Sequence, residues 1–406
     1  MFLYIDPGTG SMLFSILIGL LATLYFLARA FFIKLKFLIT GRNTSAVKKE
    51  HSIVIYNEGI QYWNNFKPVL ESLERKKIAA AYLTSAENDP FFTESYEYIS
   101  GEFIGKGNKA FARLNFLEAD ICLMTTPGLE VYQLKRSKGV RHYAHMLHDT
   151  GDATCYRLFG IDWFDSVLLS GDYQAEDIRT LENIRDTPKK ELPVVGCTYL
   201  DVLGQKKKTL PPIESKPFTV LVSPSWGPGS LLQAFGEKLL DPLAETGWHI
   251  LLRPHPQSLT AEKDMIDRLS QRYDGYRNIE WDFSPENLNS LARADVMLSD
   301  FSGIIFDYTF LFDRPVLYNN SFFNIEMYDA SDLDHMPWRF EILKKLAREL
   351  DESCLADIKQ IITESVQDSE RADIRRQARD QAWQYAGQSG DRVTEYLLEI
   401  RERIHS

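Results

Sequence analysis

The sequence predicts an α/β protein with two Rossmann-like domains facing a cleft and with an N-terminal membrane helix. From residue 52 onward, short apolar runs alternate with amphipathic stretches, and a segment rich in Lys and Pro interrupts this alternation once. Strands that alternate with helices are typical of parallel, doubly wound sheets. The chain has 406 residues, which is enough for two such domains and an appendage.

Residues 1–49 are predicted to be a transmembrane helix with a basic flank. Residues 12–28 carry no charge, and at ~1.5 Å per residue they would span about 25 Å, close to the roughly 30 Å apolar layer of a bilayer. Residues 1–49 hold six Lys and Arg side chains and one acid, Asp6. Because basic flanks stay in the cytoplasm, we expect a single pass through the inner (cytoplasmic) membrane, with the body in the cytoplasm. A buried core helix is the alternative.

The alternation of apolar runs and amphipathic stretches predicts the following strands and helices, in chain order. The first Rossmann-like domain is predicted at 50–205, with strands at 53–56, 78–83, 120–124, 140–146 and 166–169 and helices at 62–75 and 173–184. A linker follows at 206–217. The second domain is predicted at 218–385, with strands at 219–222, 249–252, 279–281, 296–298 and 314–318 and helices at 230–245, 260–273, 285–292 and from 304. Residues 386–406 are predicted to form a helix that packs on the body.

Composition excludes several classes of function. The formal net charge is −11 although the first 49 residues are basic, so the body lacks the basic surface that nucleic-acid binding needs. The four cysteines lie far apart in the sequence, and neither a disulfide framework nor a zinc site is indicated. No P-loop, G-x-G-x-x-G or G-x-S-x-G motif occurs. We expect no cofactor and no metal.

The stretch 294–308 is the strongest candidate site. A short apolar run ends at Ser299, and Ser302 and Gly303 precede a second apolar run with helical spacing. A strand, a tight turn and a helix follow from this pattern, and the backbone N–H groups at such a helix start bind anions. In open α/β sheets phosphorylated ligands bind beyond the carboxyl ends of the strands. The position therefore suits a nucleotide diphosphate, although an ordinary capped helix is the alternative.

Two further loops follow predicted strands of the second domain. In Arg253-Pro254-His255-Pro256, two prolines restrict the backbone around one histidine. His255 and Arg253 would there stabilise charge on a leaving phosphate. The turn at Ser225-Trp226, before a predicted helix, suits a second phosphate or stacking on a base.

The first domain offers a candidate base. His142, His145 and His148 cannot meet at one metal ion, because a spacing of three places them on different faces of a strand or a helix. His148, at the loop, is the better candidate for taking the proton of an attacking hydroxyl, with Asp149 or Asp152 orienting it. His142 and His145 are expected to be strand histidines with satisfied hydrogen bonds.

Together these loops resemble the CDP-glycerol glycerophosphotransferase family, whose members prime and polymerise teichoic-acid-type chains. The likeness covers roughly 143–320. Arg253-Pro254-His255-Pro256 is similar to the family's basic-x-His-Pro motif, and the segment from Asp300 through Ser302 and Gly303 to Asp307 resembles its A-D-x-x-I-T-D-Y-S-S segment. Ser225-Trp226 resembles its A-P-T-W turn. Leu147 to Gly151, with Asp149 and Thr150, is a looser counterpart of its W-H-G-T-P motif.

The resemblance implies a GT-B fold and metal-independent transfer of a polyol phosphate from a CDP-polyol donor to a lipid-linked or glycan acceptor, with release of CMP. In that scheme His148 and His255 are catalytic. The donor contacts are Arg253, Ser225, Trp226, Asp300, Ser302, Gly303 and Asp307, and Asp149, Thr150 and Asp152 lie on the acceptor side. The alternatives are a nucleotide-sugar glycosyltransferase or epimerase, and a non-catalytic, membrane-tethered, nucleotide-binding scaffold.

Overall fold

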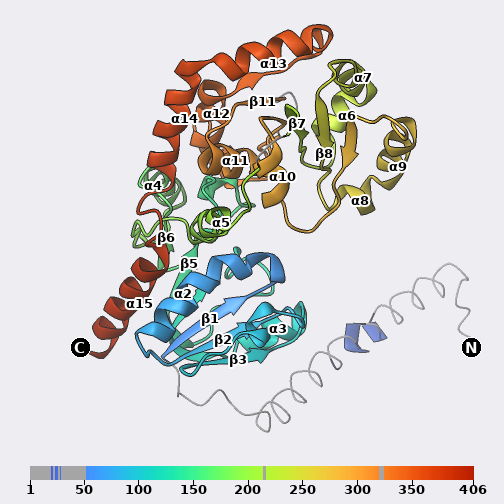
Figure 1. The fold of residues 1–406 in the computed structure, drawn as a ribbon. Helices are drawn as coiled ribbons and strands as arrows, with labels where there is room; N and C mark the ends of the chain where they lie inside the picture. Colours follow the sequence, from blue (N-terminus) through green and yellow to red (C-terminus); the bar gives the residue numbers. More distant parts are fainter. Residues whose placement is uncertain (1–19, 22, 26–27, 29–51, 214–215, 320–323) are drawn as a thin grey trace, which may run out of the picture. The chain divides into compact units, whose positions relative to one another are not determined.

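A computed structural model describes residues 52–406, apart from 214–215 and 320–323, and six residues near the N-terminus, 20–21, 23–25 and 28 (Figure 1). Residues 1–51 and 52–406 are two separate units. The predicted membrane helix at 12–28 therefore lies mostly outside the described residues. Within the described residues, no helix is both long enough and apolar enough to cross a membrane.

The first sheet has six parallel strands in the order β3-β2-β1-β4-β5-β6. They are β1 (Ile53–Asn57), β2 (Ala80–Thr84), β3 (Ile99–Phe103), β4 (Glu118–Met124), β5 (Gly139–Met146) and β6 (Ser166–Leu168). Alternate side chains of β1 enter two cores, since Val54 and Tyr56 pack on one face of the sheet and Ile53 and Ile55 on the other. A parallel sheet covered by helices requires such burial on both faces.

The helices of the first domain are α2 (Trp63–Arg75), α3 (Asn108–Leu114), α4 (Gln174–Arg185) and α5 (Thr198–Lys208). In α2, Phe66, Val69, Leu70 and Leu73 are buried, which is the spacing of one helical face turned to a core. The resulting βα alternation confirms the predicted fold class for this half.

The second sheet is also parallel, in the order β12-β11-β10-β7-β8-β9. Its strands are β7 (Thr219–Val222), β8 (His249–Leu252), β9 (Ile279–Trp281), β10 (Val296–Ser299), β11 (Val316–Tyr318) and β12 (Arg348–Glu349). The helices are α6 (Leu231–Phe235), α7 (Glu237–Glu245), α8 (Ser258–Ala261), α9 (Lys263–Arg272), α10 (Leu288–Arg293), α11 (Ile304–Phe312), α12 (Trp338–Leu346), α13 (Ile358–Gln367) and α14 (Ser369–Ala382). The second Rossmann-like half is thereby confirmed.

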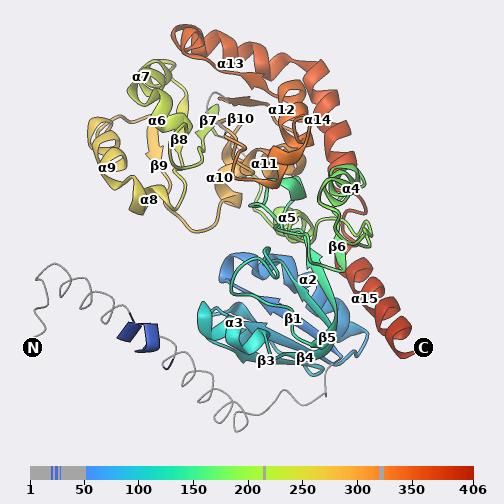
Figure 2. The same ribbon diagram turned by 180° about the vertical axis from the view of Figure 1, so that it is seen from behind.

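The last helix, α15 (Ser389–His405), returns to the first domain. Its side chains Val393, Leu397 and Ile400 belong to the same core as Ile53 and Ile55 of β1. In Figures 1 and 2, α15 lies beside the first domain, whereas α13 and α14 lie beside the second. The chain therefore begins and completes this core with segments more than three hundred residues apart.

Some predicted elements differ from the observed ones. β3 and α3 were not predicted, because β3 is an edge strand with only Ile99 buried and so shows no apolar pattern. The predicted helix at 230–245 breaks into α6 and α7 at Gly236, whose φ is 45°, a conformation that favours glycine. The predicted domain boundaries stay predictions, although α5 remains helical as far as Lys208 within the segment expected to be irregular.

Candidate active site

The candidate residues follow strands at the carboxyl edges of the two sheets. His148 comes after β5, Ser225 after β7, His255 after β8 and Ser302 after β10. Because both sheets are parallel, each set of loops gathers at one edge of its sheet, where ligands bind in doubly wound folds.

Three neighbours orient His148. Its Nδ1 lies 2.9 Å from the hydroxyl of Tyr156, its ring meets the ring of Tyr62 edge-on with centroids 5.5 Å apart, and its carbonyl accepts a hydrogen bond of 2.7 Å from the amide of Asn65. The imidazole remains 34% exposed. The protein therefore fixes the ring while leaving it open to a ligand.

Asp149 brings the two domains together. Its Oδ1 accepts a hydrogen bond of 2.7 Å from the N–H of Gly151, and its Oδ2 lies 3.6 Å from His148 Nε2. A Cβ added at Gly303 would lie 3.7 Å from the same oxygen. Burial would raise the pKa of Asp149, but the charges of His148 and Arg339 and the N–H of Gly151 hold it below its usual value. The His148 loop thus meets the start of α11.

Thr150 and Asp152 are buried residues of this loop, and each bonds to a neighbouring segment. Thr150 is buried, and its carbonyl accepts a hydrogen bond from the hydroxyl of Tyr173. Asp152 is 7% exposed, and its Oδ2 accepts a hydrogen bond of 2.8 Å from the backbone N–H of Arg339. Burial raises the pKa of Asp152 to about 7. We therefore interpret both as residues that position the loop, not as acceptor contacts.

Asp300 differs from the prediction that it contacts a donor, because it is fully buried. Its carboxylate accepts hydrogen bonds from the backbone N–H groups of Ser225 at 3.0 Å, Leu231 at 2.9 Å and Ser302 at 3.1 Å. Burial raises the pKa of Asp300, and these hydrogen bonds oppose the rise. One side chain thereby ties the loop after β7, the start of α6 and the turn before α11.

The start of α11 is partly exposed and lies beside Asp149 of the His148 loop. Gly303 caps the helix and, like Ser302, is neither buried nor fully exposed. One turn along, Asp307 accepts a hydrogen bond of 3.3 Å from the hydroxyl of Tyr199. Burial, together with the nearby charge of Asp149, raises the pKa of Asp307 to about 7. Asp307 is therefore an acid near this helix start whose charge is sensitive to pH near neutrality.

Arg253 is already engaged inside the protein, which contradicts its predicted contact with a phosphate. Its guanidinium is 8% exposed, forms an ion pair with Asp282 and donates hydrogen bonds to the hydroxyl and the carbonyl of Ser284. A cation with this many internal partners stabilises the loop after β9. The motif gave the right position at the sheet edge but the wrong role.

His255 keeps one ring nitrogen available. Its Nδ1 accepts a hydrogen bond of 3.1 Å from the backbone N–H of Gln257, which places the proton of the neutral ring on Nε2. Partial burial lowers the pKa of His255, and Glu262 partly offsets this. The ring stacks beside Trp226, with centroids 6.4 Å apart. His255 is thus a neutral hydrogen-bond donor next to an exposed indole.

The turn that carries Ser225 and Trp226 holds an unused polar group. Ser230 is 1% exposed, and its hydroxyl has no hydrogen-bond partner among the residues that the structure describes. Gly227, with φ 86°, donates its N–H to Glu262 at 3.1 Å. A buried hydroxyl without a partner is costly, so this turn is suited to receive a polar ligand.

Arg339 is the residue that sequence reasoning missed. Its backbone N–H bonds Asp152, its guanidinium donates to the carbonyl of Phe301 at 3.2 Å, and a Cβ at Gly151 would lie 3.3 Å from its Nη1. Its pKa is raised by the carboxylates of Asp149 and Asp152 despite its burial. One sequence feature could have pointed to Arg339. It is a cation in the first turn of a helix, α12, where the helix dipole disfavours positive charge.

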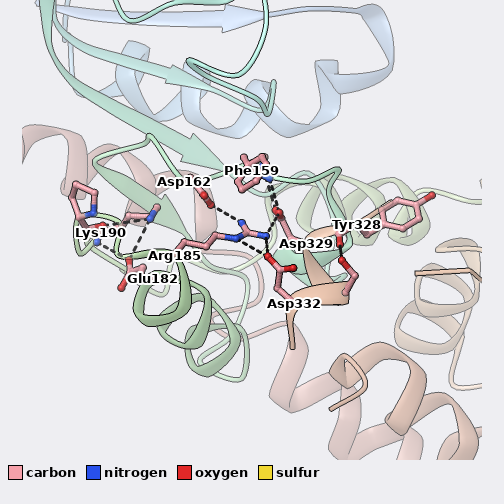
Figure 3. Close-up of polar contacts among 11 residues, drawn as sticks. Phe159, Asp162, Glu182, Arg185, Lys190, Tyr328, Asp329 and Asp332 are labelled. Carbon is pink, nitrogen blue, oxygen red and sulfur yellow. Dashed lines mark hydrogen bonds and ion pairs between the residues drawn. The ribbon is translucent and has the colours of Figure 1, made fainter. Parts of the chain in front are cut away.

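A buried charge cluster fixes the segment before α12 onto the first domain (Figure 3). The Arg185 guanidinium, 7% exposed, pairs with Asp162 at 2.9 Å, Asp329 at 2.8 Å and Asp332 at 2.7 Å. Asp329 is fully buried and also accepts a hydrogen bond of 2.6 Å from the N–H of Phe159. Because Asp329 precedes α12 by nine residues, this cluster sets the position of Arg339 beside the His148 loop.

The two strand histidines differ from each other. The imidazole of His142 has a hydrogen-bond partner, as predicted, because its Nε2 lies 2.9 Å from the hydroxyl of Ser166. For His145 the prediction was wrong, because it is fully buried and neither ring nitrogen has a partner among the described residues. It contacts the rings of Tyr156 and Phe164 instead, and burial lowers the pKa of His145 to about 3. It therefore acts as a neutral packing group.

A comparison with protein families finds a match to the second half of the chain. Residues 230–399 match the family model described as CDP-glycerol:poly(glycerophosphate) glycerophosphotransferase. No curated protein sequence matches the chain significantly. The resemblance predicted from the sequence is thus confirmed over these residues, which make up less than half of the chain.

Solved structures share the fold at low sequence identity. A structure of the wall teichoic acid polymerase TagF soaked with CDPG has a TM-score of 0.56 and 15% identity, covering 93% of this chain and 98% of that chain. UDP-GlcNAc 2-epimerase from Neisseria meningitidis, bound to UDP-GlcNAc, has a TM-score of 0.55 and 13% identity, covering 86% and 100%. MnaA of S. aureus with UDP has a TM-score of 0.55 and 13% identity, covering 86% and 97%. The TM-scores and identities of the polymerase and the epimerases are similar to one another. The comparisons with solved structures therefore support a GT-B-like fold and do not favour one activity.

Proposed function

We propose that the protein transfers a polyol phosphate, glycerol phosphate or a close relative, from a CDP-activated donor to a hydroxyl of a lipid-linked or glycan acceptor, with release of CMP. The observation that carries the proposal is the approach of Asp149, next to His148, to the start of α11 at Gly303. A candidate base of one domain then lies at the candidate phosphate site of the other. The family match over residues 230–399 supports the CDP-linked donor.

In this proposal the donor lies along the carboxyl edge of the second sheet. Its phosphates take hydrogen bonds from the backbone N–H of Gly303, from the hydroxyl of Ser230 and from Nε2–H of His255. Ser225 shapes the turn through its bond with Asp300, and the exposed ring of Trp226 offers a surface on which the cytosine stacks. Asp307 borders the donor site, and its carboxylate limits the negative charge that the site tolerates.

The acceptor is activated by His148. When Nδ1–H donates to the hydroxyl of Tyr156, the free lone pair is on Nε2, which accepts the proton of the acceptor alcohol. Asp149, 3.6 Å from Nε2, stabilises the imidazolium that forms. The alcohol oxygen bonds to the β-phosphorus, the bond from that phosphorus to the bridging oxygen breaks, and CMP departs with the electron pair. The proton remains on His148 until product release.

Arg339 supplies positive charge at the reacting phosphate. Its guanidinium already lies between the His148 loop and the turn before α11, so it needs little movement to contact the equatorial oxygens of the transferred group. Placement and charge stabilisation are most of what phosphoryl transfer requires.

We further propose that residues 12–28 anchor the protein in the inner membrane, with the body in the cytoplasm, where nucleotide donors are made. The uncharged run and its basic flank support this. Cell fractionation of the full chain and of a version beginning at Ser52 tests it. The full chain should sediment with membranes and resist salt extraction, and equal behaviour of the two versions would contradict an anchor.

A donor panel tests the activity. The protein is offered CDP-glycerol, CDP-ribitol, UDP-GlcNAc and CMP-sialic acid, with a glycerol phosphate oligomer as acceptor, and released nucleotides are quantified. We expect CMP from a CDP-polyol and acceptor elongation by one unit per CMP. Release of UDP or UMP would favour the glycosyltransferase or epimerase alternative, for which the epimerase-like fold is the supporting observation.

A further inference from the structure

Residues 324–337 lie between β11 and α12 of the second sheet, yet they contact the first domain. Tyr328 forms an isolated antiparallel bridge with Arg157, and the next residue, Asp329, is fully buried. Besides positioning α12, the segment therefore contacts the loop that follows His148 and contains Tyr156.

Both the backbone and the side chain of Asp329 bond this loop. The backbone N–H of Asp329 donates a hydrogen bond of 2.9 Å to the carbonyl of Tyr156. Its carboxylate accepts hydrogen bonds of 2.6 Å from the N–H of Phe159 and 3.2 Å from the N–H of Gly160 (Figure 3). One residue thereby fixes both ends of the loop 156–160.

The conformation of this loop depends on the carboxylate. Phe159 has φ 67°, which is unfavourable for a bulky side chain. In this conformation two successive N–H groups point at one carboxylate, as in the backbone nests that bind anions. A Cβ added at Gly160 would lie only 2.8 Å from the Cβ of Tyr156, so the loop passes Tyr156 closely. Charge-assisted hydrogen bonds to Asp329 thus offset the strain at Phe159 and hold the loop against Tyr156.

Tyr156 connects the loop to the candidate base. Its hydroxyl lies 2.9 Å from His148 Nδ1, and the two ring centroids are 5.8 Å apart. Because the carbonyl of the same residue is bonded to Asp329, a displacement of the segment 324–337 would move the partner of Nδ1. The hydrogen bond at one ring nitrogen of a histidine decides which nitrogen carries the proton.

We propose that Asp329 is a positioning residue for the candidate base: by fixing the loop 156–160, this carboxylate of the second domain sets the orientation and the tautomer of His148 in the first. The inference rests on the proposed function for the role of His148 as a base. It adds that the base is competent only while residues 324–337 are packed on the first domain. Asp329 contacts neither donor nor acceptor in this scheme, so it acts through Tyr156.

Asp329→Asn is the variant that tests the inference, because it keeps the shape of the side chain and removes its charge. The fold should survive, since Arg185 keeps Asp162 and Asp332 as partners. Burial also raises the pKa of Asp329 to about 6, so a neutral amide is tolerated at this position. Thermal unfolding checks the fold.

Asp332→Asn is the matched control. Asp332 belongs to the same segment and pairs with the same guanidinium, that of Arg185. Among the described residues, however, the bonds of its carboxylate are to Arg185 and not to the loop 156–160. The two variants thus remove the same charge from the same cluster and differ in their effect on the loop.

Nuclear magnetic resonance of protein labelled with ¹⁵N-histidine reports on His148 without any turnover. The chain has 8 histidines, and His148→Asn identifies the signals of His148. We expect Asp329→Asn to shift both ring nitrogens in the same direction as Tyr156→Phe does, and Asp332→Asn to leave them at the parent values. Unchanged signals in Asp329→Asn, or equal shifts in the two aspartate variants, would overturn the inference.

A second variant covers the case in which Asp329→Asn does not fold. Asp329→Glu keeps a negative charge for Arg185, but its longer side chain cannot reproduce the bonds to Phe159 and Gly160. The same direction of shift is expected, and parent values of the His148 signals in Asp329→Glu would count against the inference.

Steady-state assays separate this inference from the proposed function. Asp329→Asn should lower kcat about ten-fold, the cost of one hydrogen bond, and leave KM for CDP-glycerol unchanged. Asp332→Asn should keep both values. An increase in KM with an unchanged kcat would contradict a positioning role. Shifted His148 signals without CMP release from any donor would support the action of Asp329 on His148 and count against the proposed donor.

Discussion

The backbone N–H of Arg339 donates a hydrogen bond of 2.8 Å to Asp152, although 187 positions separate these residues in the chain. Asp152 lies in the loop between β5 and β6 of the first sheet, and Arg339 lies in the first turn of α12, between β11 and β12 of the second sheet. This bond brings a guanidinium of the second domain to the loop that carries His148. The arrangement places a cation beside the candidate base.

Replacing Arg339 by alanine should lower kcat about 100-fold, because a cation that meets the transferred phosphate stabilises charge that develops in the transition state. KM for the donor should change little. Lys344→Ala, on the exposed side of the same helix, is the matched control and should keep full activity. A change confined to KM would contradict a role in the transition state.

Replacing His148 by asparagine should lower transfer by roughly 100- to 10,000-fold, the usual contribution of a general base. Circular dichroism and thermal unfolding should match the parent protein, since His148 is partly exposed. His405→Asn alters a partly exposed histidine in the last turn of α15 and serves as control. Wild-type turnover by His148→Asn would exclude the proposed base.

Tyr156→Phe tests the orientation of the imidazole. The substitution deletes only the hydroxyl that lies 2.9 Å from His148 Nδ1, so the ring loses a partner that fixes its tautomer. We expect kcat to fall about ten-fold with KM unchanged, the cost of one hydrogen bond. An unchanged kcat would show that Tyr156 only packs.

Stability should depend on pH through Asp307. Its pKa is about 7 in the folded protein and about 4 in an unfolded chain. The folded state therefore binds more protons between these values, and its stability falls as pH rises from about 4 to 7 and then levels off. Asp307→Asn should match the parent Tm near pH 4 and exceed it by a few degrees at pH 7.5. A gap that narrows with rising pH would contradict the raised pKa.

Arg185→Met should destabilise the protein by about 3–5 kcal/mol, because it leaves the buried carboxylates of Asp162 and Asp329 without their cation. Arg75→Ala removes an exposed arginine paired with Asp391 and should cost less than about 1 kcal/mol. Denaturant unfolding measures both. Because the cluster positions α12, Arg185→Met should also lower kcat.

The sequence was informative where local pattern and tertiary structure agree. Apolar runs located five strands of the second sheet to within two residues, whereas β12, which has only two residues, was not predicted. Turn chemistry located the loops at the sheet edges. The roles within those loops were harder to predict, because the partner of a charged side chain is a tertiary property. Arg253 and Asp300 look like ligand contacts in sequence, yet buried partners from distant segments engage them. Arg339 shows no motif at all and gains its position from the Arg185 cluster.

The return of α15 to the first domain has a consequence for biosynthesis. During translation the face of the first sheet that holds Ile53 and Ile55 is covered only in part, by α2, until α15 has been made, since Val393, Leu397 and Ile400 complete this core. The nascent chain must therefore carry an exposed apolar surface until then. A premature stop before residue 389 would leave a product recognised by chaperones and proteases.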